Sequence, residues 1–187
     1  MAEAAIAKGG KRGADPRVRS NRMLGLVVAL CVLLVDQLAK WVVLNPLHLV
    51  ERSLGGEGIV LTPFFRFVFT ANHGVSMGFL TADSQAMRWL LVALTAGISA
   101  FVLAWLWREK RRDDSIALAL VLGGALGNIL DRVRLGYVVD FADLHFGDVH
   151  PFLVFNVGDA AITIGVLLLL VRALLTGEKK TPSEDKS

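Results

Sequence analysis

Four apolar stretches constrain the fold of this chain more than any other feature of its sequence. They cover residues 23–44, 87–107, 116–133 and 152–175. Each is long enough to cross a bilayer, which takes about 17 to 25 mostly apolar residues. Charged loops separate them, and the mean hydropathy of the 187-residue chain, +0.55, is too high for an ordinary soluble domain. We therefore predict a mainly α-helical membrane protein with four transmembrane helices.

The distribution of lysine and arginine predicts how these spans are oriented. Thirteen basic residues lie in the N-terminal tail, the loop after the second span and the C-terminal tail, whereas the other two loops hold only Arg52, Arg66 and Arg134. Because basic loops stay in the cytoplasm, we expect both termini inside. The net charge of +3 then reflects membrane anchoring, and we expect no nucleic-acid partner.

We expect a single membrane domain over residues 23–175, between two polar cytoplasmic tails. Residues 1–22 are basic and rich in glycine and alanine, which predicts a disordered tail, and residues 176–187 form the second one. The outer loops are then residues 45–86 and 134–151. Within the first of these loops, residues 58–70 are rich in valine and phenylalanine and are interrupted by Pro63, which predicts a small extracytoplasmic β-sheet of short strands.

Polar side chains interrupt three of the spans at a shared depth. Asp36 is the fourteenth of 22 residues in the outward-running first span, and Asn128 is the thirteenth of 18 in the third, with Arg132 at its exit. In the inward-running fourth span, Asn156 is fifth and Asp159 eighth of 24 residues. All five positions fall in the outer half of the membrane. This common depth predicts one polar site that opens toward the outside, because charges at membrane depth are costly and usually functional.

The spacing of these residues predicts that each span directs its polar groups one way. Residues three or four apart share a helix face, and three pairs have this spacing: Asp36 with Lys40, Asn128 with Arg132, and Asn156 with Asp159. Three glycines of the third span also allow a neighbouring helix or a substrate to come close: Gly123, Gly124 and Gly127.

Two carboxylates at such a site have a definite chemical use. Asp159 is the only carboxylate in its span, and Asp140 follows the third span closely enough to fold back over the outer end of the fourth. In a close pair, one carboxyl holds a proton while the other does not. Such a pair activates water as a base and protonates a leaving amine as an acid.

Other interpretations of the same residues stay open at this point. If the site is purely structural, Asp36 and Lys40 form an intramembrane ion pair that only joins helices. Asp159 then makes an interhelical hydrogen bond. A small membrane carrier or proton relay would use the same buried charges. Asp140, Asp159, His145 and His150 offer metal ligands, but their spacing matches no common zinc pattern, so we predict no metal and no cofactor.

Five short motifs, read in order, resemble the bacterial lipoprotein signal peptidase (signal peptidase II) family. They are DQLAK at 36–40, NHGVSMGF at 72–79, GNILDR at 127–132, GYVVDF at 136–141 and FNVGD at 155–159. Together they extend over nearly the whole chain except its tails. Gly158 departs from the pattern, since the family more often has alanine before the aspartate, and we expect this change to have little effect.

The resemblance implies an intramembrane aspartic endopeptidase of the bacterial inner membrane, with its site near the outer face. Its substrate would be a prolipoprotein that carries a diacylglyceryl group on the lipobox cysteine, with membrane lipid around it, and cleavage would occur just before that cysteine. Asp140 and Asp159 correspond to the catalytic pair. The supporting or substrate-binding residues would be Asn72, Asn128, Arg132, Asn156, Asp36 and Lys40.

Overall fold

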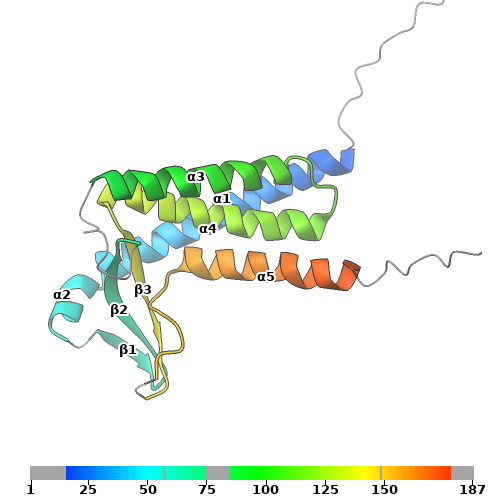
Figure 1. The fold of residues 1–187 in the computed structure, drawn as a ribbon. Coiled ribbons are helices and arrows are strands. Elements are labelled where there is room, and N and C mark those ends of the chain that lie inside the picture. Colours follow the sequence, from blue (N-terminus) through cyan, green and yellow to red (C-terminus); the bar gives the residue numbers. More distant parts are fainter. Residues whose placement is uncertain (1–15, 57, 75–84, 148, 178–187) are drawn as a thin grey trace, which may run out of the picture.

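The structure, a computed structural model, describes residues 16–56, 58–74, 85–147 and 149–177. Four long helices lie side by side with a small sheet across one end (Figure 1). They are α1 (Pro16–Leu44), α3 (Gln85–Leu106), α4 (Arg112–Leu135) and α5 (Val157–Gly177), and the short helix α2 (Leu49–Leu54) lies beside the sheet. All four long helices are apolar enough and long enough to span a membrane, which confirms the predicted fold class.

Helix α1 begins at Pro16, seven residues before the expected start of the first span. Residues 16–22, which we expected in a disordered tail, are therefore helical, while residues 1–15 lie outside the described part of the chain. Proline is favourable at a first helical position. Asn21 Nδ2 also donates to Lys110 O at 2.7 Å and Arg22 Nε to Trp107 O at 2.7 Å, so the loop between α3 and α4 holds these first turns.

Helix α5 begins at Val157, five residues later than predicted. The apolar residues before it do not join the helix, because Phe155 forms an antiparallel bridge with Ala142 and Asn156 caps the helix. An apolar run alone does not show where a helix starts when its first residues pair with a strand instead.

Helix α4 is the centre of the bundle and packs against the other three long helices. Its glycines are used for this packing. A Cβ at Gly123 would lie 2.5 Å from the carbonyl oxygen of Ala29 in α1, and one at Gly124 would lie 2.3 Å from that of Gly158 in α5. The close approach of neighbouring helices that we expected at these glycines is therefore present.

The sheet has the antiparallel order β1 (Ile59–Thr62), β2 (Phe65–Asn72), β3 (Val138–Leu144). The first two strands confirm the sheet predicted in the first outer loop, with Pro63 and Phe64 at the turn between them. The sequence did not predict β3, which comes from the second outer loop. Its first six residues are all buried, so the alternation of polar and apolar residues that identifies a half-exposed strand is missing.

The sheet is attached to the helices by an apolar cluster. Val43, Leu49, Phe141 and Ala142 form its buried part, and the rings of Phe67 and Phe141 meet edge to face with centroids 5.5 Å apart. This packing holds β3 against the end of the bundle at which α5 begins (Figure 1).

Candidate active site

Asp140 lies in the middle of β3 and is 1% exposed. Two amide side chains hold its carboxylate: Asn72 Nδ2 donates to Oδ2 at 2.8 Å, and Asn156 Nδ2 donates to Oδ1 at 2.6 Å. Burial raises the pKa of Asp140 to about 6. The Asn72 and Asn156 hydrogen bonds act against this rise in pKa, and the nearby Asp159 charge adds to it.

Asp159 lies in the first turn of α5, where a carboxylate interacts favourably with the helix dipole. It forms a reciprocal cap with Asn156: Asp159 N donates to Asn156 Oδ1 at 2.9 Å, and Asn156 N donates to Asp159 Oδ2 at 3.2 Å. The other carboxylate oxygen, Oδ1, accepts a hydrogen bond from Asn128 Nδ2 at 2.8 Å.

Asn156 therefore connects the two carboxylates. Its side-chain oxygen accepts from the backbone of Asp159 and its side-chain nitrogen donates to Asp140. The same nitrogen lies 3.2 Å from Asn128 Oδ1, so a second asparagine completes the link between α4 and α5. Asn156 itself is 1% exposed, which leaves it little freedom to move.

A buried charge network supports this group from α1. Lys40 Nζ lies 2.8 Å from both Asp36 Oδ2 and Asp131 Oδ2, and it donates to Asn128 Oδ1 at 3.2 Å. Asp36 Oδ1 in turn accepts from the backbone N–H of Gly158 at 2.8 Å. The predicted pair of Asp36 and Lys40 is thus present, and it connects α1 with α4 and α5.

Sequence reasoning missed two members of this network, Asp131 and Gln37. Asp131 is 3% exposed, and its Oδ2 accepts from the backbone N–H of Val139 at 3.1 Å, which ties α4 to β3. Gln37 Nε2 donates to Asp131 Oδ1 at 2.9 Å. Asp131 lies three residues after Asn128, a spacing that already placed both on one face of the helix.

Arg132 lies beside the two carboxylates, and its positive charge interacts with both of them. Its Nη1 makes a long hydrogen bond of 3.5 Å to Asn128 O, and its buried Nε has no hydrogen-bond partner among the described residues. Asn72, besides contacting Asp140, accepts from Gly74 N at 2.8 Å, and this bond fixes the turn after β2. All eight predicted site residues therefore lie at one end of the bundle.

Gly158 is more confined than the sequence indicates. A Cβ at this position would lie 3.0 Å from both Asn156 Oδ1 and Gly124 O, and 3.2 Å from Asp36 Oδ1. An alanine here requires these neighbours to move by a few tenths of an ångström, so the glycine matters for the spacing of α4 and α5 as well as for backbone freedom.

Among the described residues, His145 and His150 interact with Asp143, and neither bonds to Asp140 or Asp159. His150 Nδ1 is 2.9 Å from Asp143 Oδ1, and Arg66 Nε donates to Asp143 Oδ2 at 2.7 Å. Burial by itself would raise the pKa of Asp143, but the hydrogen bonds from Arg66 and His150 outweigh it and hold the pKa below its ordinary value. The described residues contain no group of three or more side chains arranged to hold a metal ion.

The two carboxylates have similar hydrogen-bond partners. Asp140 and Asp159 accept hydrogen bonds from neutral amides, and neither forms an ion pair with a described residue.

Comparisons with known proteins identify related chains. A family model described as signal peptidase (SPase) II matches residues 28–175. A lipoprotein signal peptidase of Rhizorhabdus wittichii is 59% identical over 165 residues, which cover 88% of this chain and 94% of the relative. One of Sphingopyxis alaskensis is 52% identical over 162 residues, 87% of this chain and 91% of the relative.

The fold is also similar to a solved structure of a bacterial membrane enzyme obtained by the in meso method at 1.9 Å resolution. The TM-score is 0.70 at 26% sequence identity, over 85% of this chain and 95% of the other. A second such structure, at 2.3 Å resolution, gives a TM-score of 0.68 at 25% identity, over 88% and 95% of the two chains.

Proposed function

This chain belongs to the signal peptidase II family, whose members cleave signal peptides from prolipoproteins, and we propose that Asp140 and Asp159 together activate the water for this cleavage. The observation that carries the proposal is the position of Asn156, which bonds to both residues and holds their carboxylates in one polar site. No cofactor is part of the proposed mechanism.

In this mechanism Asp159 is the base and Asp140 the acid. Asp159 lies in the first turn of α5, at the helix end where partial positive charge collects. Asp140, with a pKa of about 6, is the one of the pair that burial helps to keep protonated. Asp159 takes a proton from water, the resulting hydroxide attacks the scissile carbonyl, and Asp140 donates its proton to the leaving amine. The Arg132 charge stabilises the negative charge that develops in the site.

The proposed substrate carries a diacylglyceryl group on the cysteine after the scissile bond. A cavity of about 320 Å³ supports this part of the proposal, since it opens between β3 and α5 and one of its walls is Ala160, the residue after Asp159. Its walls are apolar and include Leu144, Phe155, Ala160 and Ile164. In the proposed complex an acyl chain occupies this cavity and the modified cysteine lies at the site formed by the two aspartates.

The proposed location is the bacterial inner membrane, with both termini in the cytoplasm. The start of α1, the loop between α3 and α4 and the end of α5 all lie at one end of the bundle, opposite the sheet (Figure 1). This basic end belongs in the cytoplasm by the positive-inside rule. The site, at the other end, then lies near the outer face of the membrane.

The alternative of a carrier or proton relay requires polar groups along the length of the bundle. In the described structure the site is followed by an apolar cluster that includes Ala29, Val102, Leu118 and Leu122. A path for ions or protons is interrupted there, and a hydrolytic site at one end needs no such path.

Replacement of each aspartate by asparagine tests the proposed pair. Asp140→Asn and Asp159→Asn remove the proton exchange, and each should slow cleavage of a diacylglyceryl-modified prolipoprotein by at least about 100-fold. Asp143→Asn is the matched control, since Asp143 lies in the same strand, is also buried, and contacts Arg66 and His150 instead. Near-normal cleavage by either of the first two variants removes that residue from the pair.

The diacylglyceryl requirement is tested with the same precursor in two forms. The unmodified prolipoprotein should be cleaved much more slowly than the lipid-modified one by the unaltered protein. Ala160→Phe, which fills the cavity between β3 and α5, should reduce this difference. Equal rates on both precursors contradict the proposed substrate but leave the aspartate pair standing.

A further inference from the structure

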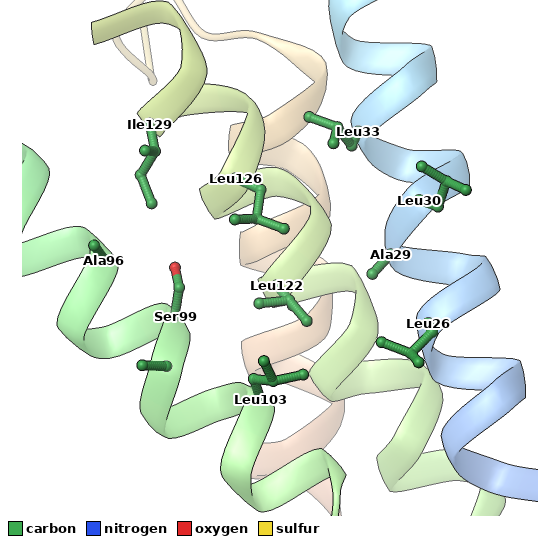
Figure 2. Close-up of a pocket in the computed structure, with 11 residues that line it drawn as sticks. Leu26, Ala29, Leu30, Leu33, Ala96, Ser99, Leu103, Leu122, Leu126 and Ile129 are labelled. Carbon is green, nitrogen blue, oxygen red and sulfur yellow. The ribbon is translucent and has the colours of Figure 1, made fainter. Parts of the chain in front are cut away.

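A second apolar cavity lies in the groove between α1, α3 and α4, away from the carboxylates (Figure 2). Its volume is about 410 Å³, and its walls are mostly leucine and alanine. The one hydroxyl in these walls, that of Ser99, donates to Thr95 O at 2.8 Å and is thus satisfied within its own helix. The groove therefore suits a purely apolar occupant.

Two helix stripes form the facing walls of the groove, and both continue toward the basic end of the bundle. On α1 the stripe contains Leu26, Leu30 and Leu33, and on α3 it contains Ala96 and Leu103 (Figure 2). Ala100 of α3 also lines the groove. Arg22 comes one turn before the first stripe and Trp107 one turn after the second.

Arg22 and Trp107 meet at this end of the groove. Arg22 Nε donates to Trp107 O at 2.7 Å, and its guanidinium carbon lies 5.0 Å from the centroid of the Trp107 ring. Just inside them the two helices are in contact, because a Cβ at Gly25 would lie 2.6 Å from Leu106 Cδ1. The apolar walls thus end in a cation and an aromatic ring.

The chemistry of this end is that of a headgroup site. Exposed basic residues lie in the first turns of α1 and in the α3–α4 loop that Arg22 contacts, among them Arg19, Arg108, Lys110 and Arg111. Basic clusters at the end of a transmembrane bundle attract anionic lipid headgroups, and tryptophan is enriched at the level of the headgroups. The Nη atoms of Arg22 donate to no other described residue, so they are available to a phosphate.

Seven residues separate Leu26 from Leu33 along the groove, which is a length of about 10 Å at 1.5 Å per residue. An acyl chain needs no hydrogen-bond partner, so it suits walls whose one hydroxyl is already satisfied.

We propose that this groove binds one anionic phospholipid of the surrounding bilayer. An acyl chain lies between α1 and α3, the phosphate meets Arg22, and Trp107 lies beside the headgroup. The proposal does not depend on the peptidase mechanism, because the groove and the carboxylates share no residue.

Native mass spectrometry of the purified full-length protein tests the proposal, with phosphatidylglycerol and phosphatidylcholine as probes. The protein should retain one phosphatidylglycerol molecule with an affinity at least about fivefold higher than for phosphatidylcholine, as expected for one basic contact. Arg22→Gln should remove this preference, whereas Arg22→Lys, which keeps the positive charge, should preserve most of it. Equal retention of the two lipids by the unaltered protein overturns the headgroup assignment.

A matched pair of variants tests the groove. Ala100→Phe fills it, and Ala104→Phe places the same ring one turn further along α3, at an exposed position outside the groove. Only the first should lose phosphatidylglycerol, and both should cleave prolipoprotein at the normal rate in detergent. If Ala100→Phe does not fold, Ala96→Phe fills the other end of the groove. Undiminished lipid retention by a folded groove variant, or a peptide or second chain bound there instead, overturns the proposal.

Discussion

Asn156 and Asp159 bond to each other's backbone N–H groups at the start of α5, at 2.9 and 3.2 Å. The residue proposed as the base is thus also the residue that closes the first turn of its helix. Its position depends on helix formation as well as on side-chain packing. The site and the boundary of α5 are therefore determined by the same contacts.

Replacement of Asn156 should affect both stability and activity. Asn156→Ala removes the helix cap, which costs about 0.5 to 2 kcal/mol of unfolding free energy, and it also removes the link to Asp140. We expect cleavage at least about 100-fold slower than normal. Thermal unfolding and cleavage assays in detergent measure the two effects. Asn45→Ala, at an exposed asparagine after α1, is the control and should change neither.

The two ion pairs of Lys40, with Asp36 and with Asp131, should be strongly coupled in their effect on unfolding free energy. Lys40→Met leaves Asp36 and Asp131 buried without their cation, and a loss of about 3 to 5 kcal/mol in unfolding free energy follows. Adding Asp131→Asn removes one of the two unpaired charges and should recover part of the loss. A double-mutant cycle from denaturation midpoints measures this coupling. Simple additivity of the two changes contradicts the proposed network.

The contact between α4 and α5 should not tolerate a side chain at Gly124. Gly124→Ala places a methyl group 2.3 Å from the carbonyl oxygen of Gly158, and overpacking of this kind costs about 1 to 3 kcal/mol. Gly97→Ala is the control, since a Cβ there meets no atom within 4 Å. The control should be neutral or more stable, because alanine is the better helix former. The unfolding temperature should thus fall for Gly124→Ala and stay the same or rise for Gly97→Ala.

The pKa of Asp140 predicts how stability changes with pH. A carboxyl whose pKa is raised on folding, here from 3.8 to about 6, stabilises the protein fully below pH 3.8, and this contribution is lost as the pH rises through about 6. The full shift corresponds to about 3 kcal/mol. Asp143, whose pKa is lowered, titrates below this range.

Denaturation midpoints between pH 4 and 7 measure this effect. The midpoint of the unaltered protein should fall with rising pH more steeply than that of Asp140→Ala, which has no carboxyl to ionise. Parallel curves for the two proteins would mean that Asp140 titrates at its ordinary pKa, and the assignment of Asp140 as the acid loses its support.

The sequence predicted the spans and the location of the site because both depend on local signals. Apolar length identifies a transmembrane helix, and the shared depth of Asp36, Asn128 and Asp159 indicates one polar cluster. Which of these residues contact one another across helices depends on how the helices pack. Spacing along one helix shows only which residues share its face. This is why Asp131, which joins α1, α4 and β3, was missed although its helix face was predictable.

Other features had no local signal at all. Strand β3 is buried on both faces, so its sequence does not alternate, and its pairing with β2 joins segments about 70 residues apart. The start of α5 depends on the bridge between Phe155 and Ala142. The glycines of α4 were identified, but only the packed helices show that backbone atoms of α1 and α5 occupy the space beside them.

The sheet combines strands from both outer loops, and this has a consequence for biosynthesis. Asp140 is held by Asn72 of the first outer loop and by Asn156, which precedes the last helix. A nascent chain that has inserted only three helices lacks Asn156 and Asp159, so its proposed centre is incomplete. On this proposal the newly made protein stays inactive until its final helix has inserted and the two loops have met.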